Sequence, residues 1–185
     1  MALSGNKGEW SEIYTLFKLL GDGKVHAGDA DMNKLELYYP ILNIIREESK
    51  RYEYRPNTDQ HIVVIDEDGH EYARISMNRF VQESESLLAE ITNGGARSFE
   101  IPASEAFMKE IGCTSLKAPS SDKADIHIVI HDLRTNMTPN LGFSIKSQLG
   151  SASTLLNAGL PTNILYKIEG VSLSDKDITS INSIK

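Results

Sequence analysis

The chain has one cysteine, no cluster of basic residues and no long apolar run, and these scarcities exclude several classes of protein. The single thiol of Cys113 cannot form an internal disulfide, which excludes a secreted scaffold built on disulfides. No apolar run approaches the ~20 residues that span a bilayer, and the N-terminal residues lack the layout of a secretory signal. We therefore expect a cytoplasmic protein with no membrane partner, in which Cys113 is a small buried side chain.

Acidic residues outnumber basic ones, which gives a formal net charge of −7. Residues 1–112 hold twelve Lys and Arg against twenty Asp and Glu, whereas residues 113–185 hold seven against six. The acidic excess therefore lies in the first part of the chain. It weakens non-specific attraction to DNA but does not exclude a local basic groove.

The length suits one domain with its own core, and no repeat, low-complexity segment or proline-rich linker divides it. Apolar residues recur at helical spacing over 8–20, which predicts a helix with one buried face. Further helices are expected over 40–54, 79–92, 102–111, 154–158 and from residue 174 onward. Strands are expected over 62–65, 72–75, 125–133, 142–149 and 163–169, with a hairpin turn at Asp66-Glu-Asp-Gly69.

The segment from residue 125 to residue 148 carries the most informative pattern. Side chains alternate between the two faces of a strand, and one face of the first strand suits a core, with Ile126, Ile128 and Ile130. Asp125 lies on the other, polar face. Polar side chains also share one face of the second predicted strand: Ser144, Lys146 and Gln148. Pairing of these strands would bring a carboxylate, a hydroxyl, an ammonium and an amide together.

This set of groups suits the hydrolysis of a phosphodiester. The reaction requires a nucleophilic water and stabilisation of developing negative charge. A hard cation such as Mg²⁺ takes carboxylate oxygens together with water and substrate oxygens, so Asp125 is the expected ligand, with the backbone carbonyl of Ile145 as another. Lys146 would orient or deprotonate the water, or hold the phosphate, and Gln148 would hydrogen-bond a phosphate or a ligand.

The order of these residues resembles the PD-(D/E)xK nuclease signature. More narrowly, three segments resemble the HpaII family of type II restriction endonucleases: Asn6-Lys-Gly-Glu-Trp-Ser-Glu-Ile-Tyr14, Ser121-Asp-Lys-Ala-Asp125-Ile126 and Gly142-Phe-Ser-Ile-Lys-Ser-Gln148. The resemblance implies an α+β fold, with a restriction-endonuclease-like mixed sheet flanked by helices and an additional N-terminal helical and hairpin region. It also implies Mg²⁺-dependent cleavage of double-stranded DNA at a CCGG-type site. A palindromic site mirrors two-fold symmetry, which makes a homodimer an expected partner arrangement.

The same resemblance implies one nuclease-like domain over residues 1–185. Members of the family are typically longer, so the chain is interpreted as the N-terminal portion of a longer enzyme or as a trimmed form of one. A glutamate on the first helix would lie near the metal, and we favour Glu12 over Glu9. The common nuclease pattern has Asp or Glu where Ser144 stands, and the HpaII-like segments share this serine. Ser144 would then bind through water, with Glu12 supplying the second carboxylate.

Contacts to DNA phosphates are expected from Lys117, Lys123 and Arg134. The run Gly150-Ser-Ala-Ser-Thr154 either caps a helix or presents backbone N–H groups to a phosphate through Ser151 and Ser153.

Other interpretations of the sequence compete with the nuclease. Two histidines four residues apart in a strand are separated by roughly 13 Å, which is too far to share one zinc ion. The Asp66 run lacks the alternating ligands of a calcium loop. Two functional alternatives stay open, namely a nuclease-like DNA-binding module that has lost catalysis and a protein-interaction domain that uses the acidic N-terminal half.

Overall fold

The computed structural model describes residues 2–95, 97–119, 124–149, 169–170 and 173–183. The chain divides into two compact units, residues 1–153 and residues 154–185. In the second unit, helix α4 (Asp175–Asn182) begins at Ser174, whose side chain forms a capping box with Asp177. The expectation of a single domain over 1–185 stays a prediction. The expected helix over 154–158 lies outside the described residues, as does nearly all of the expected strand over 163–169.

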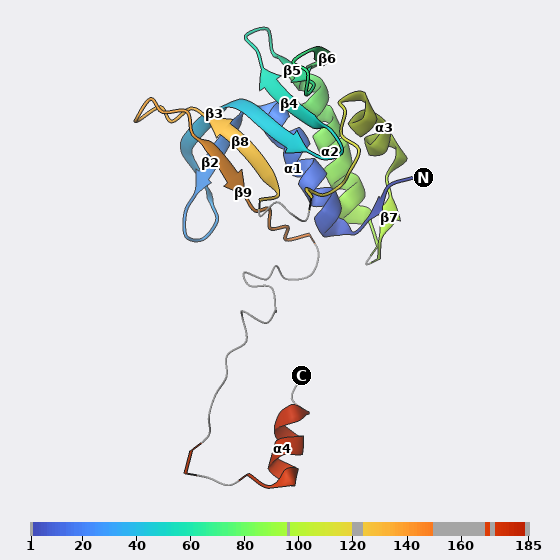
Figure 1. Cartoon of the computed structure of the whole chain (residues 1–185), viewed down its shortest axis with the longest axis vertical. Coiled ribbons are helices and arrows are strands. Elements are labelled where there is room, and N and C mark those ends of the chain that lie inside the picture. The colour runs from blue at the N-terminus through green and yellow to red at the C-terminus, as the bar shows by residue number, and fades with distance from the viewer. Residues whose placement is uncertain (1, 96, 120–123, 150–168, 171–172, 184–185) are drawn as a thin grey trace. The chain divides into compact units, whose positions relative to one another are not determined.

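A seven-stranded sheet forms the centre of the first unit (Figure 1). Its strands are β2 (Lys24–Gly28), β3 (Lys34–Glu47), β4 (Arg51–Pro56), β5 (His61–Ile65), β6 (Glu71–Ser76), β8 (Ile126–Ile130) and β9 (Asn140–Phe143). The order along the sheet is β6-β5-β4-β3-β8-β9, and β2 pairs with the first half of β3. Every pairing of the described strands is antiparallel, including the small second sheet of β1 (Ser4–Gly5) and β7 (Phe99–Glu100).

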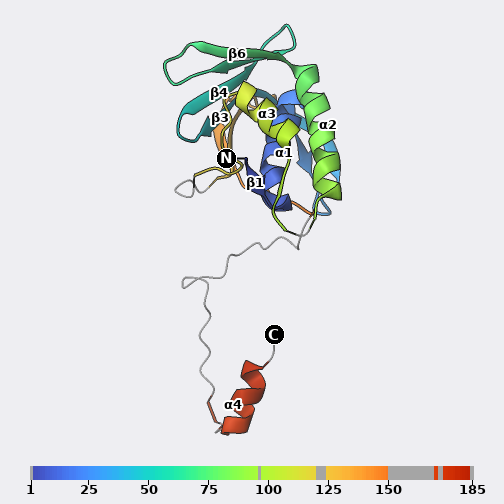
Figure 2. The ribbon, with the colours of Figure 1, turned by 90° about the vertical axis from the view of Figure 1, so that its right-hand side faces the viewer.

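Three helices cover one face of this sheet (Figure 2). They are α1 (Lys7–Asp22), α2 (Met77–Asn93) and α3 (Pro102–Glu110). Phe17, Phe80 and Phe107, one from each helix, meet edge to face with ring centroids 5.0 to 6.2 Å apart. Helix α1 begins with a capping box between Asn6 and Glu9, and it ends at Gly23, which takes the left-handed conformation (φ 64°).

The α+β fold class is confirmed, as are most of the predicted elements. The apolar residues at helical spacing in the first helix are buried, namely Trp10, Ile13, Leu16, Phe17 and Leu20, and so is Cys113. The hairpin over 62–75 and the helices over 79–92, over 102–111 and from residue 174 are also confirmed. Within the described residues, no helix is long and apolar enough to cross a membrane.

The helix predicted over 40–54 is wrong, because these residues belong to β3 and β4. A β-bulge at Leu42 explains the error. Ile41 pairs with Ile130 and Asn43 with Val129, so Leu42 is an extra residue on β3. The bulge places Ile41 and Ile44 on the same buried face, three residues apart, which imitates helical spacing.

The strand predicted over 142–149 is only partly correct, because β9 ends at Phe143. The last pair of its ladder joins Phe143 to Ile126. Residues 144–149 then leave the sheet and have no ladder partners among the described residues.

The Asp66 run is a hairpin turn, as predicted. The Asp66 carboxylate accepts the backbone N–H groups of Asp68 and His70, over 3.1 and 2.8 Å. Asp66, Asp68 and His70 lie close together, but this Asx turn accounts for their proximity.

Candidate active site

Asp125 joins the start of β8 to the segment that follows β9. Its backbone N–H donates to the carbonyl of Phe143 over 2.9 Å, and its Oδ2 accepts the N–H of Ile145 over 2.6 Å. The carboxylate is therefore fixed at the edge of the sheet, half-buried, beside the run that contains Ser144 and Lys146. The structure brings together these elements of the predicted site.

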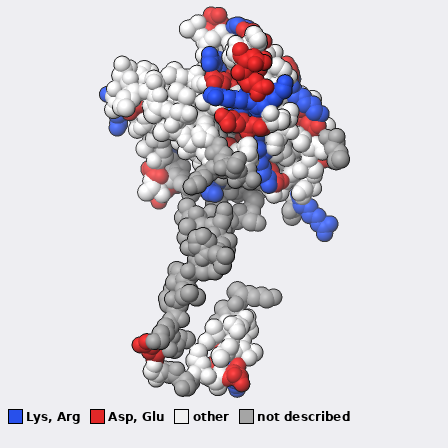
Figure 3. All heavy atoms as spheres, in the orientation of Figure 1, with Lys and Arg blue, Asp and Glu red and all other residues white. Residues whose placement is uncertain are grey.

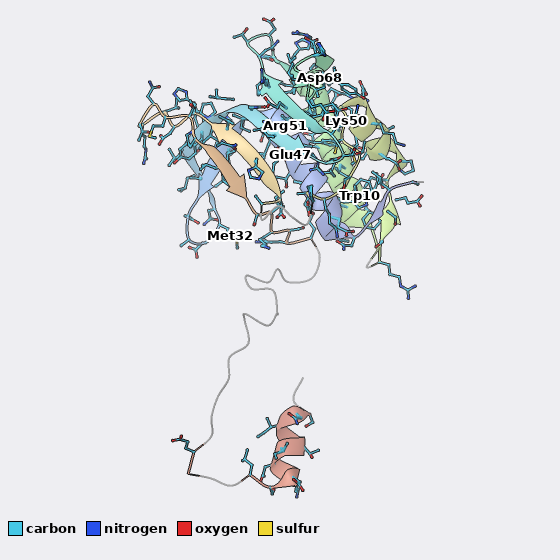
Figure 4. The ribbon with its side chains drawn as sticks, in the orientation of Figure 1. Trp10, Met32, Glu47, Lys50, Arg51 and Asp68 are labelled. Atoms are coloured by element: carbon cyan, nitrogen blue, oxygen red, sulfur yellow. The ribbon has the colours of Figure 1, made fainter. Side chains whose placement is uncertain are left out.

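Residues 144–148 keep the alternating exposure of a strand although they form no ladder among the described residues. Ser144, Lys146 and Gln148 are exposed, whereas Ile145 and Ser147 are half-buried. The three polar side chains thus point outward from one segment. Gln148 Nε2 lies 3.5 Å from the sulfur of Met32, at the tip of the β2–β3 hairpin (Figure 4).

Glu12 of α1 is the second carboxylate of the site. Its Oε2 atom is buried and has no hydrogen-bond partner among the described residues. Burial and, to a smaller extent, the nearby charge of Asp125 raise the pKa of this carboxyl to about 7. The charges of Arg46 and Lys117 and the backbone of Ala118 act in the opposite direction. A buried carboxylate oxygen without a donor, next to a second carboxylate, is a group that a cation would stabilise.

Glu9 caps the start of α1 and pairs with Lys117. Its side chain accepts the N–H of Asn6 over 2.7 Å in the capping box, and it forms an ion pair with Lys117. The pKa of Glu9 is lowered because the hydrogen bonds and charges of its partners outweigh the effect of burial, and the hydrogen bond to Glu9 raises the pKa of Lys117. Lys117, expected to contact phosphate, is therefore engaged with the helix.

The other predicted DNA contacts do not gather at the site. Arg134 lies in the turn after β8, at the opposite end of that strand from Asp125. Five strand residues separate the two ends, which corresponds to about 16 Å. Lys123, Ser151 and Ser153 lie outside the described residues.

A buried ion pair beneath the site was not predicted. Arg46 Nε lies 2.5 Å from Glu48 Oε1, and both side chains are about 6% exposed. Arg46 also donates to the carbonyl of Ser115 over 2.6 Å. Glu48 Oε2 accepts the N–H and the hydroxyl of Thr114 over 2.7 and 2.6 Å. The pair therefore holds the 113–119 segment, which carries Lys117 and Ala118, against the sheet.

Most cations on the sheet surface are paired with acids. Figure 3 shows blue and red side chains side by side over β3 and β4, while the surface over β8 and β9 is largely uncharged. Arg51 lies 2.8 Å and Arg55 2.6 Å from the carboxylate of Glu53. Lys146 lies apart from these ion pairs, on the segment after β9.

Comparison with known proteins identifies the family of this chain. The family model described as HpaII restriction endonuclease matches residues 6–185. The chain belongs to the HpaII restriction endonuclease family. It is 51% identical over 185 residues to a protein of Haemophilus parainfluenzae named type II restriction enzyme HpaII. That alignment covers 98% of this chain and 50% of the relative, so the chain spans about half the length of the relative. No solved structure matches the chain significantly.

The resemblance to the HpaII family from short motifs is thereby confirmed. The described residues of its three segments lie near one another: the charge of Asp125, just before β8, acts on Glu12 of α1, and the Asp125 carboxylate accepts the N–H of Ile145 in the run after β9.

Proposed function

We propose that this chain carries the nuclease site of a type II restriction endonuclease. It would hydrolyse phosphodiesters of double-stranded DNA at a short palindromic site of CCGG type, with Mg²⁺ as cofactor. The observation that supports this most is the pair Glu12 and Asp125, in which Glu12 Oε2 is buried beside the charge of Asp125 and has no donor within the described part of the chain. Two carboxylates brought together in this way repel each other unless a proton or a cation lies between them.

The donor set fits a hard divalent cation. Asp125 and Glu12 would supply carboxylate oxygens. The backbone carbonyl of Ile145 would supply a third oxygen ligand, since the hydrogen bond from the Ile145 N–H holds this residue beside Asp125. Ser144 is exposed next to Ile145, so it would act through water, as a neutral hydroxyl suits. A bound Mg²⁺ supplies charge stabilisation for a phosphoryl oxygen and lowers the pKa of a coordinated water.

The exposed residues of the 144–148 run would act on the substrate. Lys146 Nζ would hold a phosphate oxygen, or orient the attacking water and accept its proton. Gln148 would donate to a neighbouring phosphate oxygen through Nε2. Because Ile145, which binds Asp125, lies at a half-buried position, Lys146 next to it stays exposed and available to DNA. The contact of Gln148 Nε2 with the sulfur of Met32 uses one of its two N–H groups and leaves the other for DNA. Two copies of the protein would bind a DNA site with two-fold symmetry.

The test is cleavage of unmethylated plasmid DNA that contains CCGG sites, with Mg²⁺ and with EDTA. We expect discrete fragments only with Mg²⁺, and none from Asp125→Ala. Asp68→Ala, which changes an exposed aspartate of the β5–β6 turn, is the matched control and should cut like the wild type. Undiminished cleavage by Asp125→Ala would refute the proposal. Sequencing of the fragment ends would identify the DNA sequence that is cut.

A nuclease-like DNA-binding module is the second candidate, favoured by one observation. Position 144 offers a neutral exposed hydroxyl where nucleases of the wider group have a carboxylate. This candidate predicts retained duplex binding without cleavage at any Mg²⁺ concentration. Ser144→Glu separates the two, because cleavage that rises or survives places the position near the cation.

A further inference from the structure

A pair of serine hydroxyls joins the helix that carries Glu12 to the segment that carries Lys146. Ser11 directly precedes Glu12 on α1 and is 4% exposed. Ser147 directly follows Lys146. The two Oγ atoms lie 2.8 Å apart, which is a hydrogen-bonding distance. The contact therefore links the neighbours of two site residues that are 134 positions apart in the sequence.

The hydroxyl protons of this pair can be assigned from their other partners. Ser11 Oγ lies 2.7 Å from the carbonyl of Lys7, which can only accept, so the one proton of Ser11 goes there. The Ser147 hydroxyl then supplies the proton between the two serines. Ser147 Oγ also accepts the N–H of Leu149 over 3.2 Å. Ser147 is thus held as a donor by the helix and as an acceptor by its own segment.

The hydrogen bonds of Ile145 and Ser147 hold residues 144–149 in place where strand pairing has ended. The ladder between β8 and β9 ends with Ile126 and Phe143, and residues 144–149 lie beyond it. The run is tied to Asp125 through the N–H of Ile145, and to α1 through Ser147. Lys146 lies between the two tethers, so removal of one leaves its backbone fixed on one side only.

We propose that Ser11 and Ser147 are positioning residues that set the location of Lys146 relative to Glu12 and Asp125 during DNA cleavage. The proposal rests on the proposed nuclease function. Lysine has a long, flexible side chain, so the placement of its ammonium depends on the backbone from which it extends. A displacement of about 1 Å at a reacting group lowers a rate by up to about 100-fold. Neither serine needs to touch the substrate for this effect.

The experiment compares five variants of the whole chain: Ser11→Ala, Ser147→Ala, the double variant, Ser147→Thr and Ser84→Ala. Ser84 is the matched control, a helical serine 1% exposed whose hydroxyl donates to the Val81 carbonyl over 2.7 Å. In Mg²⁺ we expect each of the first two variants to lower kcat about 10-fold or more, with KM for DNA within about twofold.

The double variant should be no slower than the slower single variant, because each single change already breaks the same hydrogen bond between Ser11 and Ser147. Ser147→Thr keeps the hydroxyl and should keep the rate, as should Ser84→Ala.

Amide hydrogen exchange in EDTA provides a readout that does not depend on cleavage. Ser11→Ala, which changes the helix only, should speed exchange at Ile145 and Leu149, whereas Ser84→Ala should not. Unchanged exchange in Ser11→Ala overturns the positioning proposal, whether or not the chain cuts DNA. So do multiplicative rate losses in the double variant or a KM change without a kcat change. A wild-type chain that never cuts DNA, but shows the exchange effect, would instead refute the nuclease function and leave the tether as a structural contact.

Discussion

Replacement of Glu12 by Gln tests the electrostatics of the candidate site most directly. Burial and the charge of Asp125 raise the pKa of Glu12 from 4.5 to about 7 in the folded protein. An acid whose pKa is raised by folding binds its proton more tightly in the folded state. Its ionisation therefore lowers the stability of the fold. The loss develops as the pH rises from the unfolded pKa to the folded pKa and is complete above it.

The size of the effect follows from the shift in pKa. A difference of about 2.5 units corresponds to about 3 kcal/mol, at ~1.4 kcal/mol per unit. The Glu12 side chain is only partly buried, so solvent screening reduces this figure, and we expect about 1 to 2 kcal/mol. Glutamine has nearly the same shape and no charge, so Glu12→Gln should recover this amount above about pH 7.

The assay is urea unfolding of the metal-free protein in EDTA, at about pH 5 and about pH 8. At about pH 8 we expect Glu12→Gln to exceed the wild type in unfolding free energy by about 1 to 2 kcal/mol, and at about pH 5 by no more than about 0.5 kcal/mol. Glu85→Gln, at an exposed position of α2, is the control and should change neither value. A Glu12→Gln variant that is no more stable than the wild type at about pH 8 would refute the reasoning. Excess Mg²⁺ should remove the advantage of the variant, because only the wild type binds it with two carboxylates.

Three further predictions concern other parts of the molecule. Lys146→Ala should abolish Mg²⁺-dependent cleavage but leave duplex binding in Ca²⁺ within about threefold, because the change removes a reacting group and only one of the phosphate contacts; a titration and a cleavage assay on one DNA fragment measure both. Gly112→Ala should destabilise the fold by about 2 kcal/mol in urea, since a Cβ there would lie 2.8 Å from the Tyr52 ring and φ is 77°. Gly95→Ala, in open space, is its control, and equal stability of the two variants would contradict the packing argument. Burial raises the pKa of the Cys113 thiol to about 12, so iodoacetamide at about pH 8 should alkylate it only after unfolding; rapid alkylation of the folded protein, measured by mass, would show that the thiol is accessible.

Sequence patterns predicted the parts of the fold in which local signals and tertiary contacts agree. The first helix combines apolar residues at helical spacing, a capping box at Asn6 and a terminating Gly23, and it forms as expected. The isoleucines of β8 alternate with His127 and Val129 and lie in the core. The proximity of Asp125 to Ser144 and Lys146 followed from a short connection between two strands, and strands joined in that way pair in antiparallel order.

The errors arose where tertiary contacts override local pattern. Pro40 and the charged residues after it favour a helix locally, yet Ile41 and Ile44 belong to a strand whose alternation is broken by the bulge. The helix predicted over these residues gave no indication that Arg46 is buried against Glu48. Two serines far apart in the sequence carry no pattern that would predict the contact between Ser11 and Ser147. The sequence offered only the position of Ser11, a polar residue beside the apolar positions of the first helix.

The bulge at Leu42 decides which residues of β3 face the core. In a regular strand Leu42 would pair with Val129 and Asn43 with Ile128, and every residue that follows would move to the opposite face. Arg46 would then point to solvent, and the carbonyl of Ser115 would lose the cation that anchors it. Because the bulge adds one unpaired residue, loss of Leu42 would leave the pairs from Asn43 onward as they are. Within this family, therefore, relatives that lack a residue at this position should keep Arg46 buried.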